Sequence, residues 1–281
     1  MPAVLSIMTN SYGRFGPRAA LELLKDTGLS SIELPIRSPG QVTVFKEPPL
    51  VTTGMSAAEL VAVDRLLEQF GIRVTSCNVT GGNPLNDVDT EAILKRLEVA
   101  ARFDVPLVVG PAGEVDNRSQ LPELYENLLR IGDKAGDLGM TYCFETHPGI
   151  CQSHPLMLET MQALNHPHLK LNFDTANILY YNENVDGEVA LAKVCHHVRH
   201  LHLKDSHGEY RQWTFPALGY GGAVDFVRVR QIMRDCGFEG AYSIEVEGIE
   251  GEPPLTLEQM HRRVVDSVEH LRGCGFFDDC A

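Results

Sequence analysis

Signals for membranes, secretion and disulfide frameworks are missing from this sequence of 281 residues. No segment approaches the ~20 consecutive apolar residues of a membrane-spanning helix. The start, MPAVLSIMTNSYG, has neither a basic region nor a long apolar run. The seven cysteines are scattered without a CxxC pair, which favours free thiols in a reducing compartment. We therefore expect a cytoplasmic protein with no membrane partner.

Basic residues are also scarce. Lys and Arg total 24 against 38 for Asp and Glu, a formal net charge of −14. A field of this sign repels polyphosphates, so nucleic acid is not an expected partner. The sequence also lacks a GxSxG elbow, an HExxH helix, a GxxxxGK[ST] loop and a GxGxxG turn. Hydrophobic residues make up 43% of the chain, enough for a large core.

What the sequence does contain is an alternation of short β-rich runs and longer helical patterns. The expected strands are Val4–Thr9, Ser31–Pro35, Arg73–Asn78, Pro106–Gly110, Thr141–His147, Lys170–Asp174, Val198–Lys204 and Ala241–Glu247. The expected helices are Arg18–Asp26, Ala57–Phe70, Thr90–Phe103, Leu121–Leu138, Pro155–Leu164, Val185–His196, Phe226–Cys236 and Leu257–Leu271. Eight strand–helix units of about 35 residues each predict a (β/α)8 TIM barrel, which usually needs ~250 residues. Since no linker interrupts the chain, we expect a single α/β domain over residues 1–281.

The last four expected strands end in residues that bind metals. Glu145, Asp174, His202 and Glu245 stand in the phrases CFETH, NFDTAN, HLHLKD and SIEVEG. Strand alternation points all four into the barrel, at the carboxyl ends of the strands where TIM-barrel active sites lie. Three buried carboxylates without a cation would cost several kcal/mol or force protonation. We therefore expect one divalent cation here, and the ligand types suit Mn²⁺, Mg²⁺, Co²⁺ or Zn²⁺.

The other histidines have simpler interpretations. His200 is expected to be a satisfied core histidine or one that supports a ligand. We interpret His166, His168, His196 and His197 as surface residues at helix ends or in loops. The stretch HHVRHLHLKDSH is therefore not expected to be a metal-binding tract.

The phrases ETHPG, NFDTAN, HLHLKDSHGE, LGYGGAVDF and GFEGAYSIEVEG resemble the xylose isomerase-like TIM barrel superfamily, and within it the sugar phosphate isomerase/epimerase family. The resemblance covers nearly the whole chain and is strongest over residues 141–248. It implies one divalent metal, often Mn²⁺, on the four ligands named above, with Glu145 and Glu245 also serving as the acid/base pair. Its members catalyse isomerisation, epimerisation, dehydration of inosose or dehydroshikimate, and cleavage at abasic sites.

This sequence departs from two branches of the family, and these departures narrow the choice of reaction. Ketose 3-epimerases carry a histidine three residues after the strand-six aspartate, where this sequence has Asn177, and they have an Arg-rich stretch that is absent here. The endonucleases need an Asp-x-His after strand seven for further zinc ions, where this sequence reads EYRQWTFPALG. A strict 3-epimerase is therefore in doubt, and a DNA-repair enzyme is not expected.

Residues around the ligands offer further roles. His147 could serve as a base, or could hold Glu145 or a substrate hydroxyl. Lys204 could stabilise an enolate oxygen, or pair with Glu247 or Asp205. Substrate-binding candidates are Glu33, Asn78, Lys204, His207 and Arg211, with turn capping as the alternative for the first two. The acidic loop EVEGIEGEPP favours an unphosphorylated sugar or polyol.

The expected function is a divalent-metal-dependent isomerase or epimerase that acts on a keto-sugar or related polyol through an enediolate. The alternative is a carbon–oxygen lyase or dehydratase that acts on a keto-sugar, keto-glycoside or keto-inositol through the same enolate. A non-catalytic sugar-binding role and a metal-dependent hydrolase also remain open. A small-molecule sugar is the expected partner, and a homo-oligomer is allowed.

Overall fold

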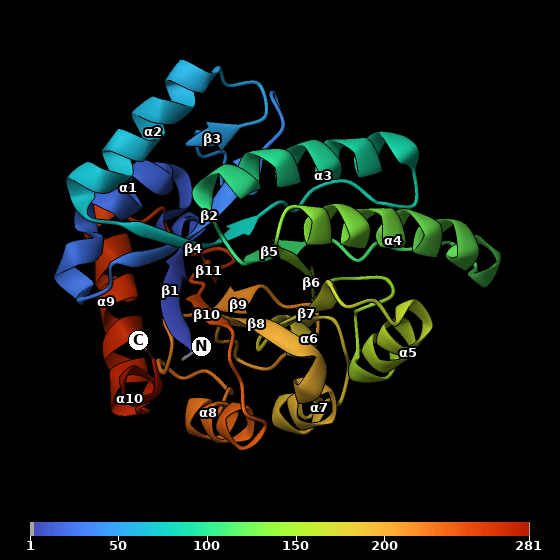
Figure 1. Cartoon of the computed structure of the whole chain (residues 1–281). Helices are drawn as coiled ribbons and strands as arrows, with labels where there is room; N and C mark the ends of the chain where they lie inside the picture. The colour runs from blue at the N-terminus through green and yellow to red at the C-terminus, as the bar shows by residue number, and fades with distance from the viewer. Residues whose placement is uncertain (1–2, 281) are drawn as a thin grey trace.

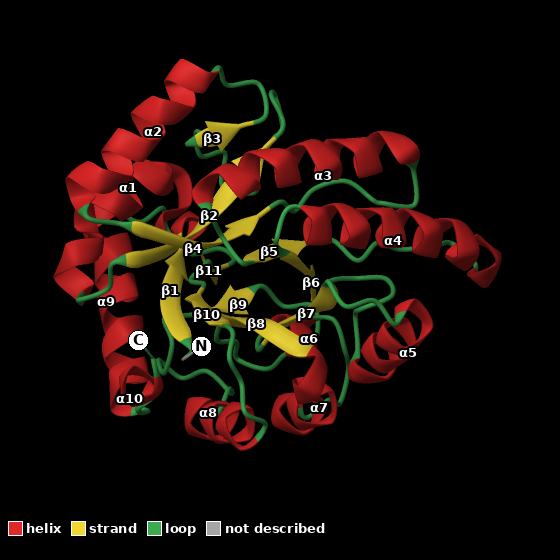
Figure 2. Ribbon diagram, in the orientation of Figure 1, coloured by secondary structure: helices red, strands yellow, loops and turns green. Residues whose placement is uncertain are grey.

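A computed structural model describes residues 3–280 of the chain. Within this range eight parallel strands form a closed barrel in the order β1-β10-β8-β7-β6-β5-β4-β2, and the pairing of β1 with β2 closes it. Helices surround this barrel (Figures 1 and 2). The barrel strands are β1 Val4–Met8, β2 Ser31–Arg37, β4 Arg73–Asn78, β5 Leu107–Gly110, β6 Thr141–Glu145, β7 Leu169–Asp174, β8 Val198–Leu203 and β10 Ala241–Ile244. The predicted single-domain TIM barrel is thus confirmed.

Eight of the helices within residues 3–280 lie close to their predicted places, whereas two short ones, Asn177–Tyr180 and Phe276–Asp279, were not predicted. The helices are α1 Gly16–Leu23, α2 Ala57–Phe70, α3 Asp87–Ala100, α4 Leu121–Asp137, α5 His154–Leu164, α6 Asn177–Tyr180, α7 Gly187–Val194, α8 Phe226–Asp235, α9 Leu257–Gly273 and α10 Phe276–Asp279. Short 3₁₀ segments cover Thr9–Phe15, Leu24–Thr27, Ala101–Phe103, Arg118–Gln120 and Cys195–His197. Glycines in the left-handed region follow several helices, where they let the chain turn toward the next strand: Gly28, Gly71, Gly139 and Gly237. No helix in residues 3–280 is long and apolar enough to cross a membrane.

Three short strands lie outside the barrel order. β3 (Val51–Thr52) pairs with the end of β2, whereas β9 (Thr214–Phe215) and β11 (Gly248–Ile249) form a separate antiparallel pair. This pair explains why β10 ends at Ile244, before the predicted end at Glu247. The Glu245 N–H still donates to the Leu203 carbonyl, but the chain then leaves the barrel to join β9.

The barrel interior is apolar at one end and polar at the other. Leu107, Val109, Cys143 and Ala241 form a small buried cluster near the amino ends of the strands. Buried polar side chains, among them Asn172 and His200, follow toward the carboxyl ends. Buried polar groups are stable only where they form hydrogen bonds or ion pairs, and Asn172 and His200 bond to each other.

Candidate metal centre

Four predicted ligands meet at the carboxyl end of the barrel. Glu145 ends β6, Asp174 ends β7, His202 lies near the end of β8, and Glu245 directly follows β10. One ligand atom from each lies within 4.8 Å of the others. The Nδ1 atom of His202 is 3.3 Å from Oε1 of Glu145, 3.8 Å from Oδ2 of Asp174 and 3.4 Å from Oε2 of Glu245. All four are buried, as alternation along the strands predicts.

Each carboxylate has one oxygen held by the protein. Oε2 of Glu145 accepts a hydrogen bond from the Thr80 hydroxyl at 3.1 Å, and Oε1 of Glu245 accepts one from Asn10 Nδ2 at 3.0 Å. Oδ1 of Asp174 accepts the backbone N–H groups of residues 176 and 177 at 2.9 and 2.8 Å. These bonds fix the orientation of the carboxylates, and the other oxygen of each faces His202.

Two of the three remaining oxygens lack protein donors. Oδ2 of Asp174 and Oε2 of Glu245 are buried and have no hydrogen-bond partner among the described residues. Leaving such acceptors unpaired is costly, and a cation coordinated by them removes that cost. Three carboxylate oxygens and one imidazole nitrogen suit Mn²⁺, Mg²⁺ or Zn²⁺. The residues present therefore fit a divalent cation.

The charges of the protein itself shift the pKa values of the carboxyl groups in this site. Burial, helped by the Glu245 carboxylate, raises the pKa of Asp174 to about 6. Burial also opposes ionisation of Glu145, but His147, His202 and Lys204 outweigh it and lower the pKa of that carboxyl. The pKa values of two neighbouring carboxyls, Asp174 and Glu145, are thus shifted in opposite directions. Such shifts are typical of functional sites.

Glu33 lies behind the histidine ligand. Its Oε2 atom is 3.0 Å from Nε2 of His202 and 3.5 Å from Nε2 of His200, and its side chain is fully buried. Burial raises the pKa of Glu33, but the two imidazoles outweigh it and lower that pKa to about 2. A carboxylate on the far nitrogen fixes the tautomer and orientation of a metal-binding imidazole.

Asn78 supports Glu33. Its Nδ2 atom donates to Oε1 of Glu33 at 3.1 Å, and its Oδ1 atom accepts from Arg37 and from the Thr80 N–H. Contacts inside the protein thus use polar atoms of Glu33 and Asn78, and the expected hydroxyl-binding roles of these two residues stay a prediction. Turn capping, the alternative for both, describes Asn78 in part.

His200 agrees with its interpretation as a supporting core residue. It is fully buried, with Nδ1 2.9 Å from Oδ1 of Asn172 and Nε2 3.1 Å from the Ser76 hydroxyl. Burial lowers its pKa to about 4, so the ring is neutral at physiological pH.

Lys204 and His147 lie on the mouth side of the ligands. Lys204 Nζ is 3.0 Å from Oε1 of Glu247, 3.6 Å from Oε2 of Glu245 and 4.3 Å from the centre of the Phe215 ring. Burial opposes its charge, but the carboxylates outweigh burial and raise the pKa of Lys204. His147 is 37% exposed, and its Nε2 lies 3.6 Å from Oε1 of Glu145, beyond hydrogen-bond distance.

Two predicted substrate-binding residues do not join this group. His207 and Arg211 are exposed, and neither side chain contacts the four ligands. The guanidinium of Arg211 lies over the Tyr210 ring at 5.2 Å. The backbone N–H of His207 donates to the Thr214 carbonyl, which ties this loop to β9. Because a long loop intervenes, parity along β8 says nothing about where these side chains point.

The sequence analysis missed Asn10 and Thr80, which hold two of the ligands. Both follow the ends of barrel strands, so the strand-end rule applied to β1 and β4 would have found them. It also missed Trp213 and Phe215, whose rings lie beside Lys204. No local pattern marks that contact, which depends on the pairing of β9 with β11.

Over 147 residues the chain is 27% identical to an inosose dehydratase from Clostridium botulinum (strain Alaska E43 / Type E3), and the match spans 47% of this chain and 48% of that protein. The chain thus covers about half the length of this curated relative.

Two solved structures resemble almost the whole chain. A D-psicose 3-epimerase determined with D-fructose has a TM-score of 0.75 at 15% identity, covering 98% of this chain and 99% of that one. A xylose isomerase-like TIM barrel protein from Mycobacterium smegmatis in complex with magnesium has a TM-score of 0.73 at 15% identity, covering 97% of each chain. At these identities the likeness shows the fold.

The family assignment rests on a longer match in sequence. Residues 21–274 match the xylose isomerase-like TIM barrel family. This range contains all four metal-ligand candidates and every barrel strand except β1. The chain belongs to the xylose isomerase-like TIM barrel family.

Proposed function

We propose that this protein is a divalent-metal-dependent sugar isomerase or epimerase that moves a proton on an unphosphorylated keto-sugar or related polyol. The observation that carries the proposal is the pair of buried glutamates at the two ends of the ligand arc. Glu145 on β6 and Glu245 after β10 flank Asp174 and His202 in the barrel order. Two carboxylates separated in this way can serve the two ends of a proton transfer.

When bound, a divalent cation at this site polarises a sugar carbonyl and acidifies the C–H bond beside it. Glu245 then accepts the proton from that carbon, and Glu145 returns a proton to the opposite face or to the next carbon. Return to the opposite face gives an epimer, whereas return to the next carbon gives an aldose–ketose isomer. Asn10 and Thr80 keep each glutamate oriented by holding its second oxygen.

Lys204 supplies positive charge on the mouth side. Its ammonium group is buried, paired with Glu247 and close to Glu245. A fixed cation in such a place stabilises negative charge that develops on a substrate oxygen. Trp213 and Phe215 cover the lysine and limit access of water to it.

A dehydratase is the second candidate, and Glu247 favours it. Burial, together with Glu245 and Asp174, raises the pKa of Glu247 to about 7 against the opposing effect of Lys204. A carboxyl that is partly protonated at neutral pH can donate a proton to a departing hydroxyl. The partial sequence likeness to inosose dehydratases supports the same candidate.

The test is product identification in D₂O. The Mn²⁺-loaded protein is incubated with ketoses, 3-keto sugars and keto-inositols, and the products are identified by NMR. We expect deuterium at the carbon beside the carbonyl, and at least a ~10²-fold loss of exchange in Glu245→Gln, which keeps the side-chain shape but cannot accept a proton. A label on the substrate carbon that follows the product through a 1,2-shift indicates hydride transfer and rejects the glutamate-base mechanism.

Glu247→Gln separates the two candidates. If the protein is a dehydratase that uses Glu247 as its acid, this variant loses dehydrated product but still exchanges deuterium into the substrate. If it is an epimerase or isomerase, the wild-type protein forms a rearranged sugar and no dehydrated product.

A further inference from the structure

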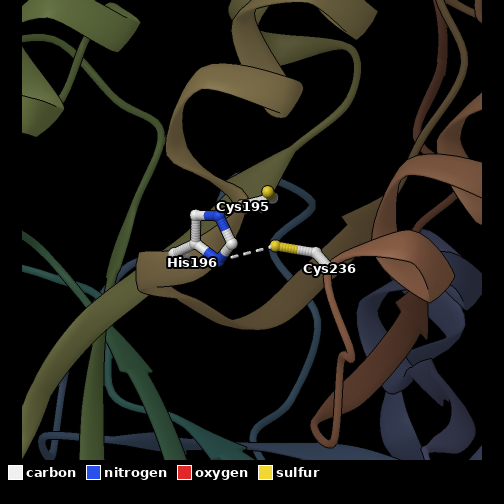
Figure 3. Close-up of side chains that lie close together, drawn as sticks. All are labelled: Cys195, His196 and Cys236. Carbon is white, nitrogen blue, oxygen red and sulfur yellow. Dashed lines mark hydrogen bonds between the residues drawn. The ribbon is translucent and has the colours of Figure 1, made fainter.

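A second group of metal-binding side chains lies away from the barrel mouth. Cys195 and His196 open the 3₁₀ segment that follows α7, and Cys236 directly follows α8 (Figure 3). Both helix ends precede barrel strands, so the group lies near the amino ends of β8 and β10, whereas Glu145 and its partners lie at the carboxyl ends. The Nδ1 atom of His196 is 3.1 Å from the Cys236 sulfur.

We propose that Cys195, His196 and Cys236 bind a thiophilic divalent cation such as Zn²⁺, with a solvent molecule as the fourth ligand. One ligand atom from each of the three residues lies within 4.8 Å of the others. Zn²⁺ bond lengths in a tetrahedral site place a nitrogen and a sulfur about 3.5 Å apart. A small opening of the His196–Cys236 contact is therefore enough to admit the ion.

Burial around the three residues suits a cation that enters from solvent. Cys195 is buried, Cys236 is half-buried and His196 is exposed. The protein thus covers one side of the group and leaves the other open, so the fourth position can hold water. Because His196 is exposed, its ring can also turn to adjust the coordination distance at little cost.

The charges balance within the site. Two thiolates neutralise a divalent cation, and the imidazole binds as a neutral ligand. Arg199 is a nearby cation, and its guanidinium is engaged with the carbonyls of residues 196 and 198 at 3.5 and 2.8 Å.

A metal site explains the three residues better than a redox-active thiol pair. A disulfide between the two cysteines would involve only their sulfurs and would leave His196 without a role. A tetrahedral cation uses both sulfurs and the Nδ1 atom of His196, which lies 3.1 Å from the Cys236 sulfur.

This site and the barrel centre should select different ions. The barrel centre offers three carboxylate oxygens and one nitrogen, but the second site offers two sulfurs and one nitrogen. Hard ions such as Mn²⁺ and Mg²⁺ prefer oxygen, and softer ions accept thiolate. The proposal is independent of the reaction at the barrel mouth. A bound ion would join the ends of α7 and α8 and so stabilise the lower rim of the barrel.

The experiment titrates the reduced full-length chain with Co²⁺ and records the ultraviolet thiolate-to-metal charge-transfer band. The barrel centre has no sulfur ligand and cannot produce this band. Because the barrel centre also accepts Co²⁺, the equivalents are counted in Asp174→Ala, which disables that centre. We expect one equivalent of Co²⁺ to saturate the band in this variant and Zn²⁺ to abolish it by displacement. The wild-type band should reach the same intensity at saturation.

Two variants and one matched control locate the ligands. Cys236→Ser and His196→Ala should each lower Co²⁺ affinity at least tenfold, and circular dichroism checks their folding. Because His196 is exposed, its variant keeps the test valid if a cysteine variant does not fold. Cys274→Ser is the control. Cys274 also lies beside a histidine, with its sulfur 3.6 Å from Nε2 of His270, but among residues 3–280 this pair belongs to no candidate group of three metal ligands.

Three results overturn the proposal. The first is the absence of a thiolate band in the wild-type chain. The second is a band of full strength in Cys236→Ser. The third is a Cys195–Cys236 disulfide that forms in place of metal binding, detected by mass spectrometry as the loss of two hydrogens.

Discussion

His202 Nε2 lies 3.0 Å from the carboxylate of Glu33, while its other ring nitrogen faces three further carboxylates. With the proton on Nε2 facing Glu33, the lone pair of Nδ1 is left for the candidate metal position, beside the Asn172 amide nitrogen at 3.1 Å. Glu33 thus acts through His202, as a positioning residue.

Glu33→Gln tests this relationship. The substitution keeps the side-chain shape but removes the charge that holds the imidazole, so we expect Mn²⁺ affinity to fall about 10–100-fold. Mn²⁺ titration followed by electron paramagnetic resonance measures the affinity. Glu59→Gln, at the exposed start of α2, is the control and should not change it. Equal affinities in both variants would show that Glu33 does not position His202.

The stabilising effect of Mn²⁺ should depend on pH through Asp174. Because the pKa of this buried carboxyl is raised to about 6, protons compete with Mn²⁺ for its oxygen as the pH falls through 6. Without metal, the raised pKa stabilises the folded chain at low pH, and that contribution is lost as the pH rises through 6. Both effects make the increase in Tm on adding Mn²⁺ larger at pH 7 than at pH 5.

Calorimetry with and without Mn²⁺ at pH 5, 6 and 7 measures this dependence. In Asp174→Asn we expect the Mn²⁺-induced shift to be small at every pH, because the ligand charge is absent. Cys236→Ser is a matched control in which the shift should persist. A shift that is equal at pH 5 and pH 7 in the wild-type chain contradicts the role assigned to Asp174.

His147→Asn distinguishes the two candidate bases. His147 is 3.6 Å from Glu145 and partly exposed, and it makes no hydrogen bond to that ligand. If the two glutamates transfer the proton, deuterium exchange in His147→Asn stays within about tenfold of wild type, with the larger change in KM. If exchange is instead abolished with Mn²⁺ still bound, while Glu245→Gln retains it, the base is His147 and a lyase reaction gains support.

Gly222→Ala should destabilise the loop that leads into α8. A Cβ atom at this position overlaps the carboxylate of Asp205. That buried carboxylate accepts the backbone N–H groups of residues 206, 219 and 224, so it has no room to move. Overpacking of this kind costs roughly 1–3 kcal/mol, measurable as a lower Tm. Gly273→Ala is the control, since a Cβ there meets nothing within 4 Å, and its Tm should not fall.

The sequence by itself determined the barrel and brought four candidate ligands to one end of it. Alternation of apolar residues sets strand and helix locally, and eight repeats of one unit leave few architectures open. Glu145, Asp174, His202 and Glu245 could be predicted because parallel strands end at a common edge. Alternation then leaves only one inward choice near each strand end.

Only the tertiary structure decided what surrounds those ligands. Glu33 and Asn78 were predicted as substrate-binding candidates, and the folded chain also gives them supporting contacts with His202 and Arg37. The course of the loop that holds His207 and Arg211 depends on the pairing of β9 with β11. This pairing brings together segments that are separated in the sequence by α8 and β10. Cys195 and Cys236 likewise meet only when α7 and α8 pack side by side. Periodicity reports which face a residue occupies, but contacts between distant segments depend on how the whole chain packs.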